Sequence, residues 1–318
     1  MSVAPSPELT AAYAACRAIA KREAKNFYYS FRVLPRHKSD AMCAVYAFMR
    51  KADDLADDES LSLDARRVAM ADWTATWRAS RTSPTTDPIF LALDDTQQRF
   101  AISDDLLEQL VAGTTLDLNP NPEGVHTLEI ASPTGPPRTI QVYDSIATLN
   151  HYCYLVASVV GLVCIRIFGY TDRRADRLAI DTGIAFQLTN ILRDIKEDAD
   201  RGRIYLPADM LREYAVAPGR ILALAAGTTP YPHEFALLRA LELHAQTLYR
   251  SADQLIPLLD ADARPSMRVL VRIYHQLLDR IAQDPAAVFS QRISVPTSQK
   301  LAILFLGILQ SFKARIIG

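Results

Sequence analysis

The feature that most constrains this chain is a helical spacing of apolar residues that runs through almost its whole length. Apolar residues recur at intervals of three and four in most long segments, and this spacing places them on one face of an α-helix. A break at Val33-Leu34-Pro35 separates the first helix from a second one, which we expect to follow Ser39 and Asp40. We predict helices near residues 7–25, 64–78, 88–100, 103–117, 144–168, 174–199, 207–214, 232–259, 264–282 and 299–315 as well.

One stretch, residues 119–142, interrupts the helical pattern. It contains two groups of turn-forming residues, around 119–122 and 132–137, and two short runs that favour strand, at 126–130 and 138–142. We interpret it as a small hairpin insertion, and a surface loop without strands remains the alternative. No internal repeat and no clear linker divides the rest. The prediction is therefore an all-α fold with a single domain over residues 1–318.

Composition excludes several classes of protein. The net charge is −1, so no basic field is present to hold nucleic acid. The apolar stretch from Leu9 to Ala20 is interrupted by Arg17, and it does not have the form of a signal peptide. We expect no segment long enough to span a bilayer, because that needs about 20 apolar residues and the nearest run is 301–309. These features favour a cytoplasmic protein.

The first chemically informative motif is the acidic run from Asp53 to Asp58. Asp53 and Asp57 are four residues apart and share one helix face, with Arg50 and Tyr46 on nearly the same stripe. Clustered carboxylates repel one another, and carboxylate oxygens are the ligands that Mg²⁺ prefers. The motif therefore indicates a magnesium site, although taken alone an acidic helix end that simply faces water is an equally good interpretation.

The second motif is more specific. Gln187, Asn190, Asp194 and Asp198 are spaced by three, four and four residues, so they form one polar stripe on a helix. An apolar stripe lies beside it, and buried polar groups without partners are costly. A cavity that holds metal and ligand would supply partners. We expect Arg193 and Glu197 to pair on another face. The predicted ligand has a diphosphate head and a long apolar tail. The apolar stripe consists of Ile184, Leu188, Ile191 and Ile195.

Three longer segments resemble the squalene/phytoene synthase family. NFYYSFRVLPRHKSDAMCAVYAFMRKADDLADD (26–58) is similar to its opening segment, YCYLVASVVG (152–161) to its central helix, and AFQLTNILRD (185–194) with RIYLP (203–207) to its second signature. The resemblance extends from about residue 15 to 285. It implies an isoprenoid synthase helical bundle around a central apolar cavity, and head-to-head condensation of two prenyl diphosphates with Mg²⁺. The start at residues 23–26 departs from the serine- or histidine-bearing start of relatives.

The resemblance also implies roles for individual residues. The metal ligands would be Asp53, Asp57, Asn190, Asp194 and Asp198. Arg50 would contact diphosphate, Tyr152 would lie near the reacting carbons, and Asp117 matches a frequently acidic position. The remaining residues expected to bind substrate are Tyr46, Gln187, Arg203, Tyr205, Val156, Ala157 and Gly161.

Substrate choice is left between two alternatives. The segment around Tyr152 is most similar to bacterial presqualene diphosphate synthases of hopanoid pathways, which implies two farnesyl diphosphates as substrates and leaves open a further step to squalene with NADPH. Phytoene synthesis from geranylgeranyl diphosphate is the second reading. A terpene cyclase and a non-catalytic cation-binding bundle are the competing classes.

The C-terminal run at 301–309 has two readings as well. It is expected either to be a buried last helix or to contact the inner face of a membrane, because Lys300, Lys313 and Arg315 flank it. Oligomeric state is left open.

Overall fold

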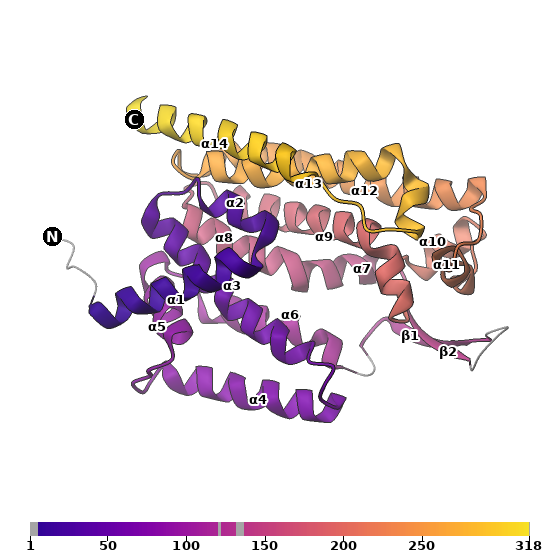
Figure 1. Ribbon diagram of the computed structural model, residues 1–318, viewed down its shortest axis with the longest axis horizontal. Coiled ribbons are helices and arrows are strands. Elements are labelled where there is room, and N and C mark those ends of the chain that lie inside the picture. The colour runs from indigo at the N-terminus through magenta and orange to yellow at the C-terminus, as the bar shows by residue number, and fades with distance from the viewer. Residues whose placement is uncertain (1–5, 120–121, 132–136, 318) are drawn as a thin grey trace.

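The computed structural model describes the backbone of residues 6–119, 122–131 and 137–317, and their side chains apart from 25–27, 117 and 310–317. Helices dominate these residues, which confirms the predicted all-α class (Figure 1). The helices are α1 Pro7–Glu23, α2 Lys25–Phe31, α3 Arg36–Ala56, α4 Leu63–Ser80, α5 Pro88–Phe100, α6 Asp104–Thr115, α7 Ile146–Cys153, α8 Val159–Phe168, α9 Arg174–Asp200, α10 Ala208–Glu213, α11 Pro218–Ala225, α12 Pro232–Leu255, α13 Arg264–Gln283 and α14 Thr297–Ile317.

Helix boundaries differ from the predicted ones at a few places. α3 begins at Arg36, with Pro35 as its N-cap residue, and so it includes Ser39 and Asp40, which it was expected to follow. Proline suits that position because the first amides of a helix have no partner within it. The short helices α2 and α11 were not predicted. Each has fewer than ten residues, which is too short for a clear periodic signal.

The predicted hairpin is present in residues 119–142. Strands β1 Val125–Ile130 and β2 Arg138–Tyr143 pair antiparallel, with Leu128 opposite Ile140. The turn at 132–136 lies outside the described residues. A short strand, β3 Arg203–Ile204, pairs parallel with β2, and the Gln141 amide donates to the Gly202 carbonyl at 2.8 Å. The hairpin is thereby fastened to the segment that directly follows α9.

The long segment 146–168 runs through the middle of the fold as α7, a π-helical turn at Tyr154–Ser158, and α8. Its mean hydropathy is 1.8, and by length and composition it passes the test for a membrane span. The prediction that no segment is long enough to span a bilayer is therefore wrong. Within the fold, 44% of the segment's most apolar window is buried, because α8 and the π-helical turn pack against α9. A buried core helix of this length and composition can pass the same test.

One cluster of buried apolar side chains joins elements from Ala12 to Val295. α9 packs against α12 as well as against α8, while α13 and α14 form a layer along the opposite edge from α4 (Figure 1). A continuous core of this kind is what one domain requires, and the single-domain interpretation stays a prediction.

The close approach of α9 to the π-helical turn depends on Gly183. A Cβ atom built there would lie 2.5 Å from Ser158 Cα, while the Ser158 hydroxyl donates to the Ile180 carbonyl at 2.6 Å. We expect Gly183→Ala to lower the free energy of unfolding by about 1–3 kcal/mol, because backbone must move to admit the methyl group. Chemical denaturation measures the change.

Gly219→Ala is the matched control, since the nearest atom there is a flexible Ile130 methyl at 3.1 Å. Equal effects of the two substitutions would show that close packing at Gly183 does not cause the decrease in the free energy of unfolding.

Candidate active site

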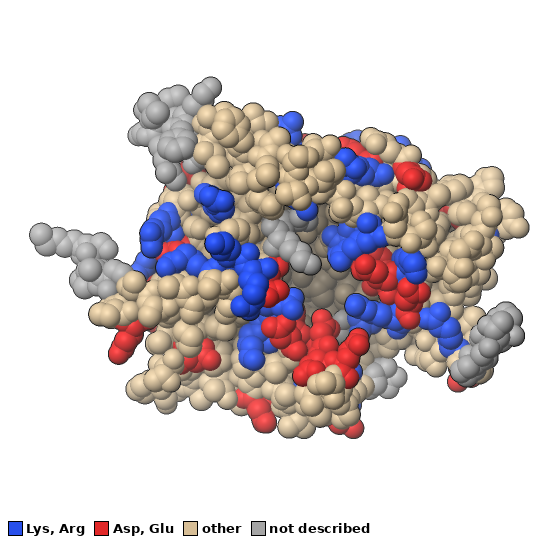
Figure 2. Space-filling view, viewed as in Figure 1, with Lys and Arg blue, Asp and Glu red and all other residues tan. Residues whose placement is uncertain are grey.

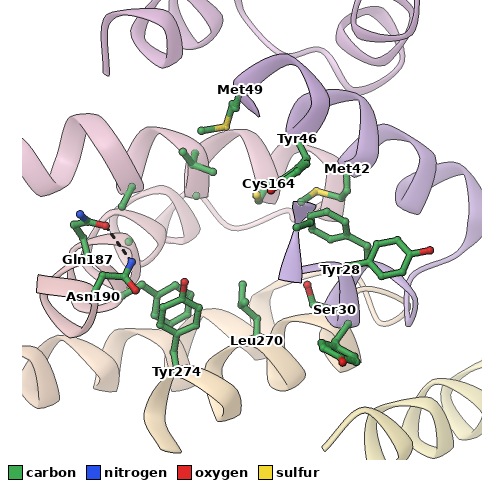
Figure 3. Close-up of a pocket in the computed structure, with 18 of the residues that line it drawn as sticks. Tyr28, Ser30, Met42, Tyr46, Met49, Cys164, Gln187, Asn190, Leu270 and Tyr274 are labelled. Carbon is green, nitrogen blue, oxygen red and sulfur yellow. Dashed lines mark hydrogen bonds between the residues drawn. The ribbon is translucent and has the colours of Figure 1, made fainter. Parts of the chain in front are cut away.

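A cavity of about 1050 Å³ lies between the helices. Its walls come from the end of α1, from α2, α3, the 156–168 segment, α9 and α13, and from residues 292–301. Figure 3 shows Gln187 and Asn190 at one end, Tyr28, Ser30 and Met42 toward the other, and Leu270 across from Tyr46 and Met49. Ligand pockets of ordinary size run from about 300 to 1,000 Å³. This cavity therefore has room for more than one small ligand.

One face of α3 lines the cavity and changes character along its length. Met42, Val45 and Met49 give an apolar wall, and Arg50 and Asp53 follow on the same face in the last two turns. Because residues three and four apart share one face of a helix, the same face of α3 gives the wall its apolar part and then its charged part. A site of this form can hold an apolar chain at one end and a charged group at the other.

Residues of the first acidic motif divide between the cavity and the surface. Asp53 lines the cavity, whereas Asp57 is exposed at the C-cap of α3 and is not part of the wall. Arg50 pairs with Asp54 at 2.6 Å, and its Nε is buried without a hydrogen-bond partner among the described residues. That orphaned donor lies in the wall beside Asp53, where an anionic ligand would satisfy it.

Tyr46 lies one turn before Arg50 and also lines the cavity. Burial raises the pKa of Tyr46 to about 12, and the nearby Asp53 carboxylate acts in the same direction while Arg50 opposes it. The hydroxyl therefore keeps its proton at neutral pH and is a hydrogen-bond donor.

The polar stripe of the second motif is carried by α9, as predicted. Gln187 and Asn190 line the cavity, and the Asn190 amide donates to Gln187 Oε1 at 3.2 Å. Asn190 Oδ1 is buried with no hydrogen-bond partner in the described structure. An unpaired buried acceptor at the polar end of a cavity is a position where a cation or a donor from a ligand fits.

Asp194 and Asp198 continue the stripe one and two turns beyond the cavity wall. Asp194 accepts hydrogen bonds from Arg193, with Nε at 2.7 Å, and lies 3.1 Å from Nε of Arg292. The expected pairing of Arg193 with Glu197 is therefore wrong, because the guanidinium turns to its sequence neighbour. Glu197 instead lies 3.7 Å from Arg292.

Asp198 has the most perturbed carboxyl group of the two motifs. Burial, together with the neighbouring Asp194 carboxylate, raises the pKa of Asp198 to about 7, and Arg203 and Arg201 oppose the shift. A carboxylate in this state gains most from a divalent cation, because the cation offsets both the lost hydration and the like charge.

Tyr152, Tyr205 and Arg203 lie outside the cavity wall. Tyr152, Tyr205 and Tyr143 form a compact aromatic group, with ring centroids 5.2–5.4 Å apart and the Tyr152 and Tyr205 hydroxyl groups 3.2 Å apart. Arg203 and Tyr205 border a separate small void that also touches Asp198. The structure thus groups these residues near the end of the second motif and away from the apolar part of the cavity.

The central helix supplies the expected apolar wall. Val156 and Ala157, which lie in the π-helical turn, and Gly161 in α8 all line the cavity. π-helical turns often occur at functional sites, and this one cannot be read from apolar spacing. The side chain of Asp117 lies outside the described residues.

Several cavity residues from the C-terminal third were missed. Met267, Leu270, Tyr274 and Leu277 share one face of α13, and their spacing of three, four and three could have identified them as a buried stripe. Arg292 and Lys300 line the cavity too. They lie in or near an irregular segment, where no periodic signal exists.

The donor groups present suit Mg²⁺ bound together with a diphosphate. Within the described side chains, no group of three or more His, Cys, Asp or Glu residues converges as a metal site. Mg²⁺ does not need one, because it is usually held by one or two carboxylates, water and substrate phosphates. Asp53 in the wall, the unpaired Asn190 Oδ1 and the raised pKa of Asp198 fit that mode.

Acidic side chains gather on two sides of a hollow in the face shown in Figure 2, with basic side chains along its rim. The cavity wall includes Lys21, Arg22, Arg32, Arg193, Arg292 and Lys300 in addition to Arg50. Such an opening, above a largely apolar chamber in a helical bundle, is the arrangement of an all-α isoprenoid synthase. The sequence profile of the squalene/phytoene synthase family matches residues 20–299, and the chain belongs to this family. Members are prenyltransferases that join two prenyl diphosphates head to head.

Relatives of both substrate types are similar to this chain. A phytoene synthase of Mycobacterium bovis is 32% identical over 302 residues, covering 93% of this chain and 90% of the relative. A presqualene diphosphate synthase of Zymomonas mobilis is 31% identical over 260 residues, covering 81% and 80%. Among solved structures, a dehydrosqualene synthase in complex with ligand has a TM-score of 0.75 at 27% identity, covering 94% of this chain and 96% of its own.

Proposed function

We propose that this protein condenses two farnesyl diphosphates to presqualene diphosphate in a magnesium-dependent reaction. The observation that carries the proposal is the mixed character of one cavity, whose wall contains Asp53, Arg50 and Asn190 together with many apolar side chains. Its volume of about 1050 Å³ suits two isoprenoid chains lying together. The similarity to a presqualene diphosphate synthase supports the choice of substrate.

The two acidic motifs would hold the metal. Asp53 and Asp57 would bind from α3, and Asn190, Asp194 and Asp198 from α9. Bound Mg²⁺ supplies charge neutralisation, which makes the diphosphate a better leaving group. In the structure Arg193 and Arg292 pair with Asp194, so their guanidinium groups lie where they would turn to a bound diphosphate instead.

The reaction itself needs few protein groups. In one substrate the bond between C1 and the diphosphate oxygen breaks, and the electron pair leaves with the diphosphate. The double bond of the second substrate attacks the resulting allylic cation. Loss of one proton closes a cyclopropane ring, and the second diphosphate stays on the product. The cavity wall contains no His among the described residues, and we therefore assign the proton to the released diphosphate.

The chain's own residues would bind, orient and protect the reactants. Arg50 would donate charge-assisted hydrogen bonds from its unpaired Nε, and Tyr46 would donate from its hydroxyl. The walls at Val156, Ala157 and Gly161 would keep the two chains parallel and exclude water from the cation. Tyr152 with Tyr205 and Arg203 would act at the metal-binding end of α9.

Phytoene synthesis from two geranylgeranyl diphosphates is the second candidate. The similarity to a phytoene synthase, over 93% of this chain, favours it. Its first condensation would use the same residues on longer prenyl chains. Phytoene also requires the cyclopropyl diphosphate intermediate to lose its second diphosphate, rearrange and lose a second proton, so the two candidates differ in this further step as well. We place either reaction in the cytoplasm at the inner face of a membrane, because phytoene is apolar and presqualene diphosphate, although it keeps one diphosphate, has long apolar chains.

The experiment supplies the purified protein with farnesyl or geranylgeranyl diphosphate and Mg²⁺, with and without NADPH, and identifies products by mass spectrometry. We expect presqualene diphosphate from farnesyl diphosphate, at a kcat/KM at least about tenfold above that for the longer substrate, since each missing or extra methylene group changes transition-state binding by about 1–3 kcal/mol. Phytoene as the preferred product would establish the second candidate. A cyclic monomeric terpene, or no turnover, would overturn both.

A further inference from the structure

The last helix exposes an apolar face. Leu301, Phe305, Leu306 and Leu309 are 51%, 62%, 44% and 44% exposed, and they are half of the large apolar side chains that stand exposed in the described part of the chain. The opposite face is buried, and a Cβ atom at Gly307 would lie 2.3 Å from a Val269 methyl group. Residues 301–309 of α14 are therefore apolar on both sides, and the protein covers only one side of this described part.

Basic residues lie on α14 and on the segments that pack against it or directly follow them. α14 contains no Asp or Glu in its 21 residues, and Lys300 lies in its first turn. It packs against α13 and α2, where Arg268, Arg272 and Arg32 are exposed. Asp260 and Asp262, which precede α13, pair with the buried Lys38 and do not offset these charges. Figure 2 shows tan, uncharged surface along this part of the molecule.

The same face adjoins the cavity. Leu301 lines the cavity wall and is also exposed on the outer surface of α14, and the neighbouring Lys300 lines the cavity wall as well. An apolar chain that leaves the cavity past Leu301 would pass directly onto the exposed stripe. The exposed apolar face of α14 thus begins at the cavity and extends over the outer surface of the protein.

We propose that the outer face of α14 docks on the surface of an anionic lipid bilayer, with Leu301, Phe305 and Leu309 inserted among the lipids. A basic helix with an exposed apolar face has the chemistry of an interfacial helix, and Lys and Arg residues beside it are attracted to anionic headgroups. The role we assign to docking, which is direct release of the apolar product, rests on the proposed function.

A second copy of this chain is a poorer occupant. A two-fold dimer through this face would bring the same patch of each copy together. Lys300, Arg32, Arg268 and Arg272 would then lie near their own counterparts, and like charges repel. Charge complementarity therefore favours the lipid surface.

The test measures binding of the purified full-length protein to sedimenting vesicles of phosphatidylcholine mixed with phosphatidylglycerol, and to vesicles of phosphatidylcholine alone. The variant is Phe305→Gln/Leu309→Gln, which leaves the cavity wall unchanged. The matched control is Val68→Gln/Leu243→Gln, because these side chains are 60% and 46% exposed on other helices. Circular dichroism and turnover of prenyl diphosphates without vesicles verify that each variant is folded.

We expect wild type and control to bind the anionic vesicles and to bind the neutral ones more weakly. The α14 variant should lose at least about tenfold in partition coefficient, since two apolar side chains no longer leave water. Equal binding of all three proteins would overturn the proposal. So would a wild-type dimer that does not bind vesicles and that the α14 variant converts to a monomer. Vesicle binding without turnover of either prenyl diphosphate would support the docking surface and contradict the proposed function. Turnover without vesicle binding would support the proposed function and contradict the docking surface.

Discussion

Asp53→Asn is expected to lower kcat by about a thousandfold or more, because an amide has no charge with which to hold Mg²⁺ at a developing diphosphate leaving group. Asp53 is the acidic residue of the first motif that lines the cavity. The substitution keeps the size of the side chain, so the fold and thermal stability should change little. Product formation from radiolabelled prenyl diphosphate at several magnesium concentrations measures the effect.

Asp58→Asn is the matched control within the same motif. The Asp58 carboxylate accepts hydrogen bonds from the backbone and hydroxyl of Ser60, and it does not line the cavity. Its replacement should change kcat by less than about twofold, since only a local surface contact is lost. Near-wild-type activity of Asp53→Asn at ordinary magnesium would contradict the metal-site assignment, whatever the control does.

The fold could be predicted as far as the spacing of apolar residues determines it. Long helices such as α9 carry an apolar stripe of many turns, so their existence and approximate ends follow from the sequence. The start of α3 was misplaced because Pro35 can precede a helix or end one. The π-helical turn at Tyr154–Ser158 packs closely against α9 at Gly183, and the spacing of apolar residues carries no signal for such a turn.

The site was predictable in part for the same reason. Gln187, Asn190, Asp194 and Asp198 share one face of α9, because a helix fixes the directions of its side chains. The pairing of Asp194 with Arg292 joins positions 98 residues apart along the chain, counted from 194 to 292, and no spacing rule reaches so far. Tyr152 illustrates the limit of a resemblance. The match to the family motif did not indicate that the Tyr152 side chain packs against Tyr205, outside the cavity wall.

Asp198→Asn should make the metal-free protein more stable at pH 8 and less sensitive to magnesium. The pKa of Asp198 is raised from its ordinary 3.8 to about 7 by burial and by the Asp194 carboxylate. Folding therefore favours the protonated form, and this stabilisation is fully present below about pH 4 and is lost as pH rises through about 7. Allowing for solvent screening of a partly exposed group, the variant should gain about 2 kcal/mol at pH 8 and nothing at pH 4.

Denaturation at the two pH values in the presence of a chelator measures that gain, and repetition with Mg²⁺ and inorganic diphosphate measures the effect of the metal. The ligands should stabilise wild type at pH 8 and should stabilise Asp198→Asn clearly less. Asp200→Asn is the control, because Asp200 is exposed on the same helix and pairs with Lys196 at 2.8 Å, a contact worth less than about 1 kcal/mol.

The dependence of stability on pH distinguishes two explanations for the role of Asp198 that activity measurements alone could not distinguish. If Asp198 serves only to hold α9 in place, its replacement lowers stability at both pH values. If it is held ready for a cation, replacement raises stability only where the carboxylate is ionised, and the gain disappears when wild type receives Mg²⁺ and diphosphate. The second result would show that the ionised Asp198 carboxylate destabilises the metal-free protein and that the bound metal removes this destabilisation.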